Sequence, residues 1–277
     1  MDNGQRLVAF TQRSVPLLSI VDSVTHLFHS SLVINELRIL TGWLSTSLGR
    51  RCLVEEQRLV ERVLETVFGD QLLQVGVWGS PEIFIRYART QHSMLLDFRP
   101  QEGITIVSSA NSLAVANDSV DTVVLPHTLE WTRSPHTLLR EVTRVLRADG
   151  YLIKLCFSPT GFWGLRHLFT SRRGYPPGRR RLISENHLRD WLELLGLEVC
   201  ERVRYCHTLP LERMAQLAVF TNQALTTRWL PLFSGGYCLV AQKQVYPVTT
   251  IRLAWKNRSL KAVGGLVQPN LRMVMPC

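Results

Sequence analysis

Two glycines and an acid have the spacing of a cofactor-binding loop. The stretch Leu72–Pro81 reads LLQVGVWGSP, an apolar run that ends in a turn containing Gly76 and Gly79. Glycine lets a backbone approach a ligand closely. Asp97 follows Gly76 by 21 residues, about the spacing at which an acid meets ribose hydroxyls in dinucleotide-binding folds. The same residues would also form a tight turn and a surface carboxylate, so the pattern alone leaves both interpretations open.

The segments around this loop alternate between strand-like and helix-like patterns. Apolar residues recur at helical spacing over Leu53–Phe68, among charged residues, and Gly69 follows as a stop. Short apolar or β-branched runs predict strands. The expected strands are Leu72–Gly76, Met94–Phe98, Ile104–Val107, Asp121–Leu125, Tyr151–Phe157, Leu197–Tyr205 and Tyr237–Val245.

Two further helices are marked at both ends. Ser134 is the expected N-cap of the first, with Pro135 at its first position and Gly150 closing it. Ser184 is the expected N-cap of the second, and Gly196 ends it. Strands that alternate with helices at this spacing predict a mostly parallel sheet covered on both faces. The last two strands lack a helical crossover between them, which favours an antiparallel addition at one edge.

A sheet of this kind binds ligands beyond the carboxyl ends of its strands, where helix N-termini and backbone amides face outward. Three strand ends are therefore candidates for a site: the loops after Val75, Leu96 and Leu125.

The stretch Ser119–Leu165 carries a longer pattern whose parts come in a set order. An acid opens a strand, a His-x-Leu-Glu turn follows, and Ser-Pro begins a helix with Leu-x-Glu-x-x-Arg-Val-Leu before a glycine turn. Here the parts are Asp121, His127–Glu130, Ser134–Pro135, Leu138–Leu146 and Ala148–Gly150. The order and spacing resemble the second half of the class I S-adenosylmethionine-dependent methyltransferases, type 11 group.

The resemblance covers about residues 41–255 and is to a bacterial branch in which a variant first motif is usual. Its further parts are Trp43–Leu48, the 53–68 helix, LLQVGVWG, Phe157–Leu165 and Arg204–Tyr205. It implies an α/β fold with a Rossmann-like, seven-stranded, mostly parallel sheet. The expected domains are an N-terminal extension (1–40), a methyltransferase-like domain (41–245) and a basic C-terminal tail (246–277).

The resemblance also implies S-adenosylmethionine as cofactor, an unknown methyl acceptor and no metal. The residues expected to bind the cofactor are Gln74, Gly76, Val77, Gly79, Asp97, Ser109, Ala110, Leu125 and Pro126. His127 is the expected base or substrate contact, with Glu130 as its orienting partner. The alternative is that both residues only hold their loop. Trp131 and Trp163 could wall a substrate pocket or belong to the core.

Three positions depart from the family pattern. Gln74 stands where an acid is usual, Trp78 where a glycine is usual, and Ser109 near a position that often holds an acid. Gln74 could accept the same hydrogen bond as the acid, without charge assistance. Each loss would cost about 1–3 kcal/mol. The alternative function is therefore a pseudo-methyltransferase that keeps the fold and acts as a binding or scaffold protein.

Charge adds a third alternative, association with RNA. The 277-residue chain has a net charge of +10, and basic residues gather in Val245–Cys277 and Ser171–Arg181. The second cluster contains Arg172, Arg173, Arg179, Arg180 and Arg181. Such clusters can contact phosphates, but a solvated loop and a loose tail explain them as well.

The remaining composition is that of a globular protein. Apolar residues make up 45% of the chain, and the longest uncharged run, Gly103–Asn117, is too short and polar to span a bilayer. Six cysteines are scattered without a CxxC pair, which argues against zinc spacing and a disulfide scaffold. No cleavage pattern follows the apolar run Val15–Val21, so we expect no signal peptide and a cytoplasmic location.

Overall fold

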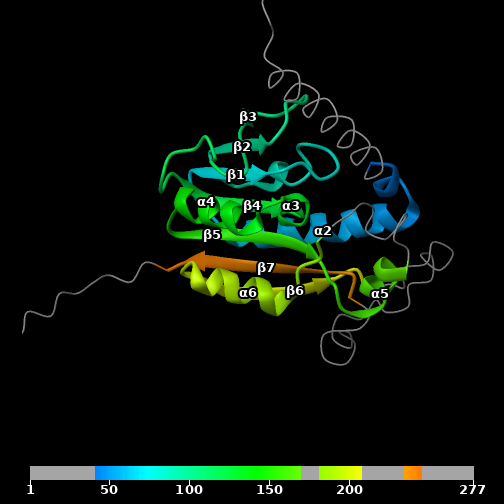
Figure 1. Ribbon diagram of the computed structural model, residues 1–277. Coiled ribbons are helices and arrows are strands. Elements are labelled where there is room, and N and C mark those ends of the chain that lie inside the picture. The colour runs from blue at the N-terminus through cyan, green and yellow to red at the C-terminus, as the bar shows by residue number, and fades with distance from the viewer. Residues whose placement is uncertain (1–40, 170–180, 208–233, 245–277) are drawn as a thin grey trace, which may run out of the picture. The chain divides into compact units, whose positions relative to one another are not determined.

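The computed structural model of the chain describes residues 41–169, 181–207 and 234–244. Within these residues, a seven-stranded sheet has the order β3-β2-β1-β4-β5-β7-β6 (Figure 1). The strands are β1 (Gln71–Val75), β2 (His92–Asp97), β3 (Ile106–Val107), β4 (Val120–Pro126), β5 (Leu146–Phe157), β6 (Leu197–Tyr205) and β7 (Gly236–Lys243). The helices are α2 (Ser47–Thr66), η1 (Ile85–Tyr87), α3 (Thr128–Trp131), α4 (Pro135–Val145), α5 (Gly161–Phe169) and α6 (Glu185–Leu194).

The direction of the strands confirms the predicted α/β architecture. β1 to β5 pair in parallel, whereas β7 runs antiparallel to both of its neighbours, β5 and β6. The antiparallel strand therefore lies one place in from the edge. Parallel order brings the carboxyl ends of β1, β2 and β4 to the same edge of the sheet, where the candidate loops begin.

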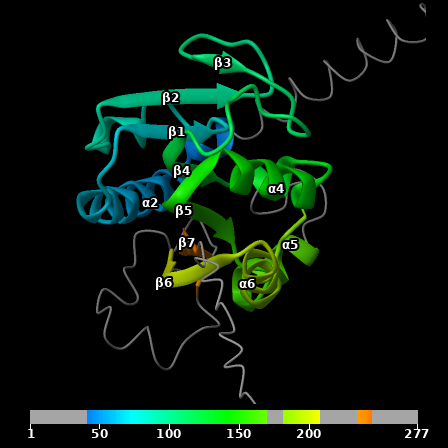
Figure 2. The same ribbon diagram turned by 90° about the vertical axis from the view of Figure 1, so that its left-hand side faces the viewer.

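Helices cover both faces of the sheet, as Figure 2 shows, with α2 on one face and α4 and α6 on the other. Each face has its own apolar cluster. On the α2 side, Val60 and Leu64 pack with Ile153 and Leu155 of β5. On the other side, Leu139 of α4 and Leu188 of α6 belong to the second cluster.

Helix α2 begins before the predicted range Leu53–Phe68. Thr46 is its N-cap and accepts a hydrogen bond from Gly49 N at 3.1 Å. The helix ends at Thr66, so the prediction that Gly69 stops it is wrong. Gly69 is instead packed against Asp121, whose Cβ would lie 2.5 Å from a Cβ at this position.

Helix α4 starts where the sequence predicts but ends earlier. Ser134 is at the N-cap position and Pro135 stands in the first turn as predicted, but the Ser134 side chain makes no capping bond, and its Oγ donates to Asn111 Oδ1 at 2.9 Å. The helix ends at Val145, and β5 follows at once, so Gly150 does not close it. Asp149, with φ of 60°, takes the left-handed conformation in this turn.

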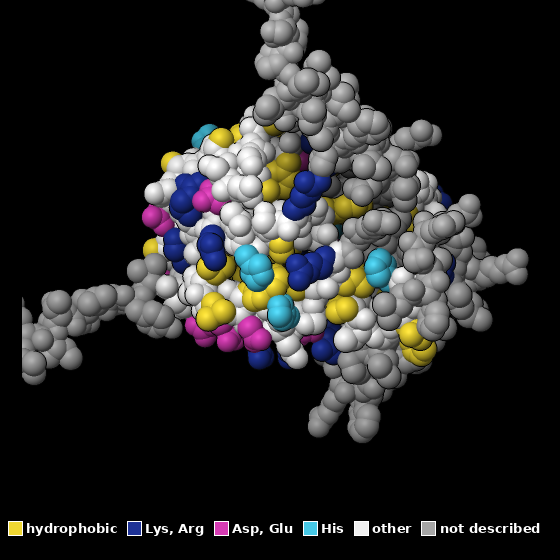
Figure 3. All heavy atoms as spheres, viewed as in Figure 1, with side chains coloured by type: hydrophobic (Ala, Val, Ile, Leu, Met, Phe, Trp, Pro, Cys, Tyr) yellow, Lys and Arg dark blue, Asp and Glu magenta, His cyan; other side chains and the backbone are white. Residues whose placement is uncertain are grey.

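Helix α6 agrees with the prediction at both ends. Ser184 Oγ accepts from His187 N at 3.4 Å, and Gly196 has a φ of 76°. Trp191, which is partly buried against the second cluster, has the rings of His136 of α4 and His187 of α6 at 3.8 and 4.7 Å from its own. Figure 3 shows histidines among apolar and basic side chains on the face where α4 and α6 lie.

The domain boundaries remain predictions. The predicted extension (1–40) and tail (246–277) lie outside the described residues. Among the helices that are described, none is long and apolar enough to cross a membrane.

Candidate functional site

The loop after β1 and the end of β2 lie together, as the glycine–acid spacing predicts. Gly76 N donates to Leu96 O at 2.7 Å, which continues the β1–β2 ladder beyond the strand. The Asp97 carboxylate accepts hydrogen bonds from Phe98 N at 2.5 Å and Gln101 Nε2 at 2.9 Å. The backbone N–H of Val77, in the loop after β1, acts on the same carboxylate and favours its charged form. Burial raises the pKa of Asp97, while these donors work in the opposite direction.

The two glycines have backbone conformations that favour glycine. Gly76 has a φ of 90° and Gly79 a φ of 74°. A Cβ at Gly76 would lie 2.7 Å from Thr128 Oγ1, and that hydroxyl donates to Val75 O. Gly76 is therefore required by contact with the start of α3 as well as by the turn.

Gln74 is fully buried at the carboxyl end of β1. Its Nε2 donates to Gly76 O at 3.0 Å. Its Oε1 accepts no hydrogen bond within the described ranges. A buried acceptor without a donor is costly, so this oxygen is a candidate ligand contact.

The other predicted cofactor residues lie at two places. Leu125 and Pro126 are buried at the end of β4, next to β1. Ser109 and Ala110 lie in the turn after β3, where Ser109 is exposed and forms a bridge with Ser112. The strand order places that turn beyond β2, at the other end of the candidate edge.

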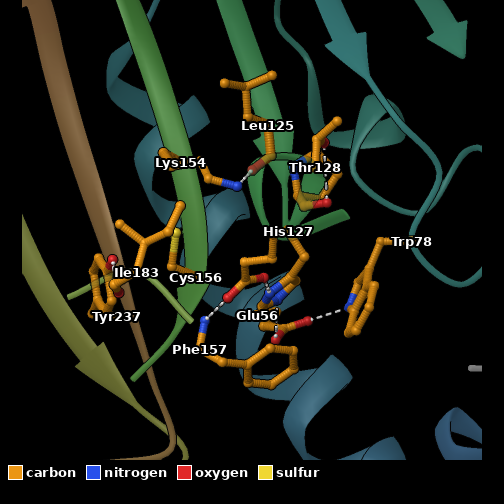
Figure 4. A network of polar contacts seen from close by, with 12 residues as sticks. Glu56, Trp78, Leu125, His127, Thr128, Lys154, Cys156, Phe157, Ile183 and Tyr237 are labelled. Atoms are coloured by element: carbon orange, nitrogen blue, oxygen red, sulfur yellow. Dashed lines mark hydrogen bonds and ion pairs between the residues drawn. The ribbon is translucent and has the colours of Figure 1, made fainter. Parts of the chain in front are cut away.

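His127 is buried within a stack of aromatic rings (Figure 4). It follows β4 in the left-handed conformation, with φ of 55°. Its ring centroid lies 4.2 Å from that of Trp78 and 4.1 Å from that of Phe157. Trp43 packs against the edge of the stack, with its centroid 6.1 Å from that of Phe157.

Two carboxylates hold the His127 ring from opposite sides. Nδ1 lies 2.8 Å from Glu130 Oε2, and Nε2 lies 3.1 Å from Glu56 Oε1. The structure thus brings His127 and Glu130 together as predicted. The second Glu130 oxygen accepts from Phe157 N at 2.7 Å, which also ties the turn to the end of β5.

Glu56 is a residue that sequence reasoning missed. It projects from α2 and is fully buried. Its Oε2 accepts from Trp78 Nε1 at 2.7 Å, and Cys52 Sγ donates to its Oε1 at 3.5 Å. The signal was an acid on the apolar face of α2, between Cys52 and Leu59 or Val60, where an unpaired charge is rarely tolerated.

Lys154 in β5 is a second buried charged residue that the sequence left unassigned. Its Nζ donates to Leu125 O at 3.1 Å (Figure 4). Burial lowers the pKa of Lys154, and the nearby Cys156 and Glu130 act in the opposite direction. It therefore ties the end of β4 to β5 and places its amino group near Glu130.

The remaining residues singled out in the sequence are two tryptophans and a cluster of arginines. Trp163 is buried in the apolar cluster on the α2 side of the sheet, and Trp131 is partly buried against the same cluster. Of the arginine cluster, Arg172, Arg173, Arg179 and Arg180 lie outside the described residues, and Arg181 is exposed. In the described part of the chain, no group of three or more His, Cys, Asp or Glu side chains is placed to hold a metal ion.

Comparison with known proteins identifies the family of the chain. A family profile described as "Methyltransferase domain" matches residues 84–154. The Escherichia coli (strain K12) protein YafS, described as uncharacterized, is 32% identical over 185 residues, which cover 66% of this chain and 72% of YafS. The chain belongs to the type 11 group of class I methyltransferases, in the same family as YafS.

The fold of the methyltransferase family is also found among solved structures. A Thermotoga maritima protein described as an S-adenosylmethionine-dependent methyltransferase, possible histamine N-methyltransferase, superposes with a TM-score of 0.53. The match covers 76% of this chain and 96% of that one at 18% identity. At this identity the likeness concerns the fold of the methyltransferase domain alone.

Proposed function

We propose that this protein transfers the methyl group of S-adenosylmethionine to an acceptor. The observation that carries the proposal is the group of contacts at the carboxyl edge of β1 and β2. There a buried Gln74 oxygen, which has no donor among the described residues, lies in the strand that leads to Gly76. The Asp97 carboxylate meets the backbone of the same loop at Val77.

The residues present fit the two ends of this cofactor. Asp97 is an acceptor suited to ribose hydroxyls, as its spacing from Gly76 indicates. Gln74 Oε1 is an acceptor suited to the ammonium of the methionine half. Trp78, the bulky residue that departs from the family pattern, is fully buried and hydrogen-bonded to Glu56. Its indole therefore lies in the core and not on the exposed side of the loop.

When bound, S-adenosylmethionine supplies an electrophilic methyl group on a sulfonium. The part of this chain in the reaction would be to hold and orient the reactants, since proximity and alignment alone can supply much of the rate of such a transfer. His127 is poorly suited to be a free base, because both of its ring nitrogens already face carboxylate oxygens. We assign it to the support of the site.

Calorimetry and thermal unfolding with S-adenosylmethionine and S-adenosylhomocysteine test the proposal, because a ligand that binds only the folded state raises stability. Asp97→Asn should weaken binding about tenfold, by weakening a charge-assisted contact. The matched control is Asp149→Asn, an exposed acid outside the site, which should leave binding unchanged. Absence of any shift at millimolar ligand would reject cofactor binding. Gly76→Arg is a poor test, because it would collide with Thr128.

The complete burial of His127 and Glu130 favours a second candidate, a pseudo-methyltransferase. Such a protein would bind the cofactor, or nothing, and act as a scaffold. The two candidates separate on turnover: an enzyme forms S-adenosylhomocysteine when offered an acceptor pool of small molecules, protein and RNA. Binding without any such turnover would favour the pseudo-methyltransferase.

A further inference from the structure

A buried carboxylate–imidazole–carboxylate row lies between α2 and the turn after β4. Its members are Glu56, His127 and Glu130, and all three side chains are fully buried. The order of contacts is Glu56 Oε1 to Nε2 at 3.1 Å and Nδ1 to Glu130 Oε2 at 2.8 Å. Figure 4 shows the His127 imidazole beside Glu56 and between the rings of Trp78 and Phe157.

Counting protons restricts the state of this row. Each ring nitrogen faces a carboxylate oxygen, so both contacts are hydrogen bonds only if the ring carries two N–H groups or one acid carries the proton. The remaining carboxylate oxygens have donors of their own: Trp78 Nε1 for Glu56 Oε2 and Phe157 N for Glu130 Oε1. Because the oxygens turned away from the ring already accept N–H donors, two carboxylates with an imidazolium between them satisfy every contact of the row with charge-assisted hydrogen bonds.

Other groups that face the row are compatible with this state. The Cys52 thiol donates to Glu56 Oε1, and burial raises its pKa well above the usual value. The Tyr205 hydroxyl lies 3.4 Å from His127 Nε2 and 3.4 Å from the Cys156 carbonyl oxygen, to which it can donate. Lys154 interacts electrostatically with Glu130 from β5. None of these contacts requires His127 to be neutral.

Glu56 differs from Glu130 in what its second oxygen contacts. The second oxygen of Glu130 accepts a hydrogen bond from the backbone N–H of Phe157, at the end of β5. Glu56 accepts a hydrogen bond from Trp78, which is part of the loop after β1, and the rings of Trp78 and His127 lie with centroids 4.2 Å apart at an interplanar angle of 35°. One side chain of α2 thus fixes both the cofactor loop and the imidazole.

We propose that Glu56 is a positioning residue that joins the loop at Trp78 to an imidazolium at His127, so that the two move as one unit. The inference rests on the proposed function for its consequence, which is that Glu56 helps to hold the loop ready for S-adenosylmethionine. Because Trp78 stands where the wider family usually has glycine, this link belongs to chains that carry the variant motif. A chain with glycine there has no indole for the acid to hold.

The test compares Glu56→Gln with the wild type and with Glu55→Gln. Glu55 is the next residue of α2, and its carboxylate accepts from Cys206 N at 2.7 Å, so this control removes an equal charge without touching Trp78 or His127. Nitrogen-15 NMR of histidine side chains reports the ring state. We expect doubly protonated shifts for His127 in the wild type and Glu55→Gln at neutral pH, and a neutral tautomer in Glu56→Gln.

The link between Glu56 and the loop at Trp78 can be measured separately, without a methyl acceptor. Hydrogen exchange of the Trp78 indole N–H should quicken at least tenfold in Glu56→Gln, and affinity for S-adenosylhomocysteine should fall about tenfold. Trp78→Phe keeps the ring and removes the N–H. It should weaken the affinity similarly while His127 stays doubly protonated, and it decides the matter if Glu56→Gln does not fold.

The outcomes separate this inference from the proposed function. A neutral His127 in the wild type, or ring shifts and indole exchange unchanged in Glu56→Gln, would overturn the link between Glu56, Trp78 and His127. Normal ligand affinity in both Glu56→Gln and Trp78→Phe would overturn its consequence for the loop. If the wild type binds no S-adenosyl ligand, the proposed function fails, whereas the NMR and exchange results still decide the link.

Discussion

Trp78 Nε1 donates a hydrogen bond to Glu56 Oε2 at 2.7 Å, and both side chains are fully buried. The tryptophan that replaces a family glycine is therefore part of the core between α2 and β4. Its ring fills space beside His127 and Phe157. At this position the indole N–H of Trp78 and the carboxylate of Glu56 therefore satisfy each other inside the core.

Trp78→Gly tests this interdependence. The substitution restores the glycine of the family pattern, yet we expect the free energy of unfolding to fall by about 3–5 kcal/mol, the range for truncation of a large buried aromatic side chain. It also leaves Glu56 Oε2 without its donor. Urea unfolding followed by circular dichroism measures the loss.

Trp78→Phe is the control that separates the loss of ring packing from the loss of the indole hydrogen bond. It keeps an aromatic ring and removes the indole N–H, so the expected loss is smaller, about 1–3 kcal/mol for one buried bond to a charged group. If Trp78→Gly were as stable as the wild type, the indole would not be a core element. Tighter cofactor binding in that variant would point to the tryptophan as an obstacle.

The sequence predicted the sheet because each strand and helix carries its own local pattern. The β-branched run that includes Val123 and Val124 can only be a buried strand, and the strand order then brings Gly76 near Asp97. Ser134 was predicted less well, because its hydroxyl found a partner in Asn111, 23 residues earlier in the chain. Local capping rules do not include such competitors.

The site was predicted in part, for a similar reason. His127 and Glu130 are three residues apart, so one turn explains their contact. Glu56 is 71 residues from His127, and its neighbours Glu55 and Arg58 make it look like one more solvated charge. Its place on the apolar face of α2 was the one signal in the sequence, and only the packing of α2 on the sheet shows that its partners are Trp78 and His127.

Arg144 holds the segment that leads into β4, and Arg144→Lys should destabilise the fold. The guanidinium makes two bonds to Glu141, at 3.0 and 2.8 Å, and donates to the carbonyl oxygens of Leu113 and Val115. A lysine has three donors on one atom and cannot match this fork. We expect a loss of about 1–2 kcal/mol in urea unfolding.

Arg140→Lys is the matched control for that experiment. Arg140 lies one turn earlier on α4 and is exposed, so the same change of side chain should alter stability by less than about 0.5 kcal/mol. Equal losses in the two variants would mean that Arg144 contributes only through helix propensity or charge.

Asp121 should make stability depend on pH on the acid side. Burial disfavours its charge, but the backbone N–H of Gln71, Arg147 and the N–H of Asp70 hold its pKa below the usual value. The unfolded chain therefore takes up this proton first, and the contribution is present above about pH 4 and lost as the pH falls below it.

The measurement is urea unfolding of the wild type and Asp121→Asn at pH 7 and at about pH 3. The variant should be less stable at neutral pH, and the difference between the two proteins should shrink in acid. Asp149→Asn, at an exposed position, should follow the wild type at both pH values. A difference that stayed constant with pH would show that the Asp121 charge is not what the contacts recognise.

Gln74→Leu tests the buried oxygen that carries the proposed function. The variant keeps the size of the side chain, loses the 3.0 Å bond to Gly76 O and removes an Oε1 that has no donor in the described residues. We expect a folded protein whose affinity for S-adenosylhomocysteine is at least tenfold lower, measured by calorimetry.

Thr122→Val is the control, because Thr122 Oγ1 is also buried without a described partner, on the neighbouring strand β4. Thr122 lies near the start of that strand, away from the carboxyl edge, so its removal should leave affinity unchanged. Equal affinity in Gln74→Leu and the wild type would mean that the orphan oxygen belongs to the core and that the ligand, if bound, is held elsewhere.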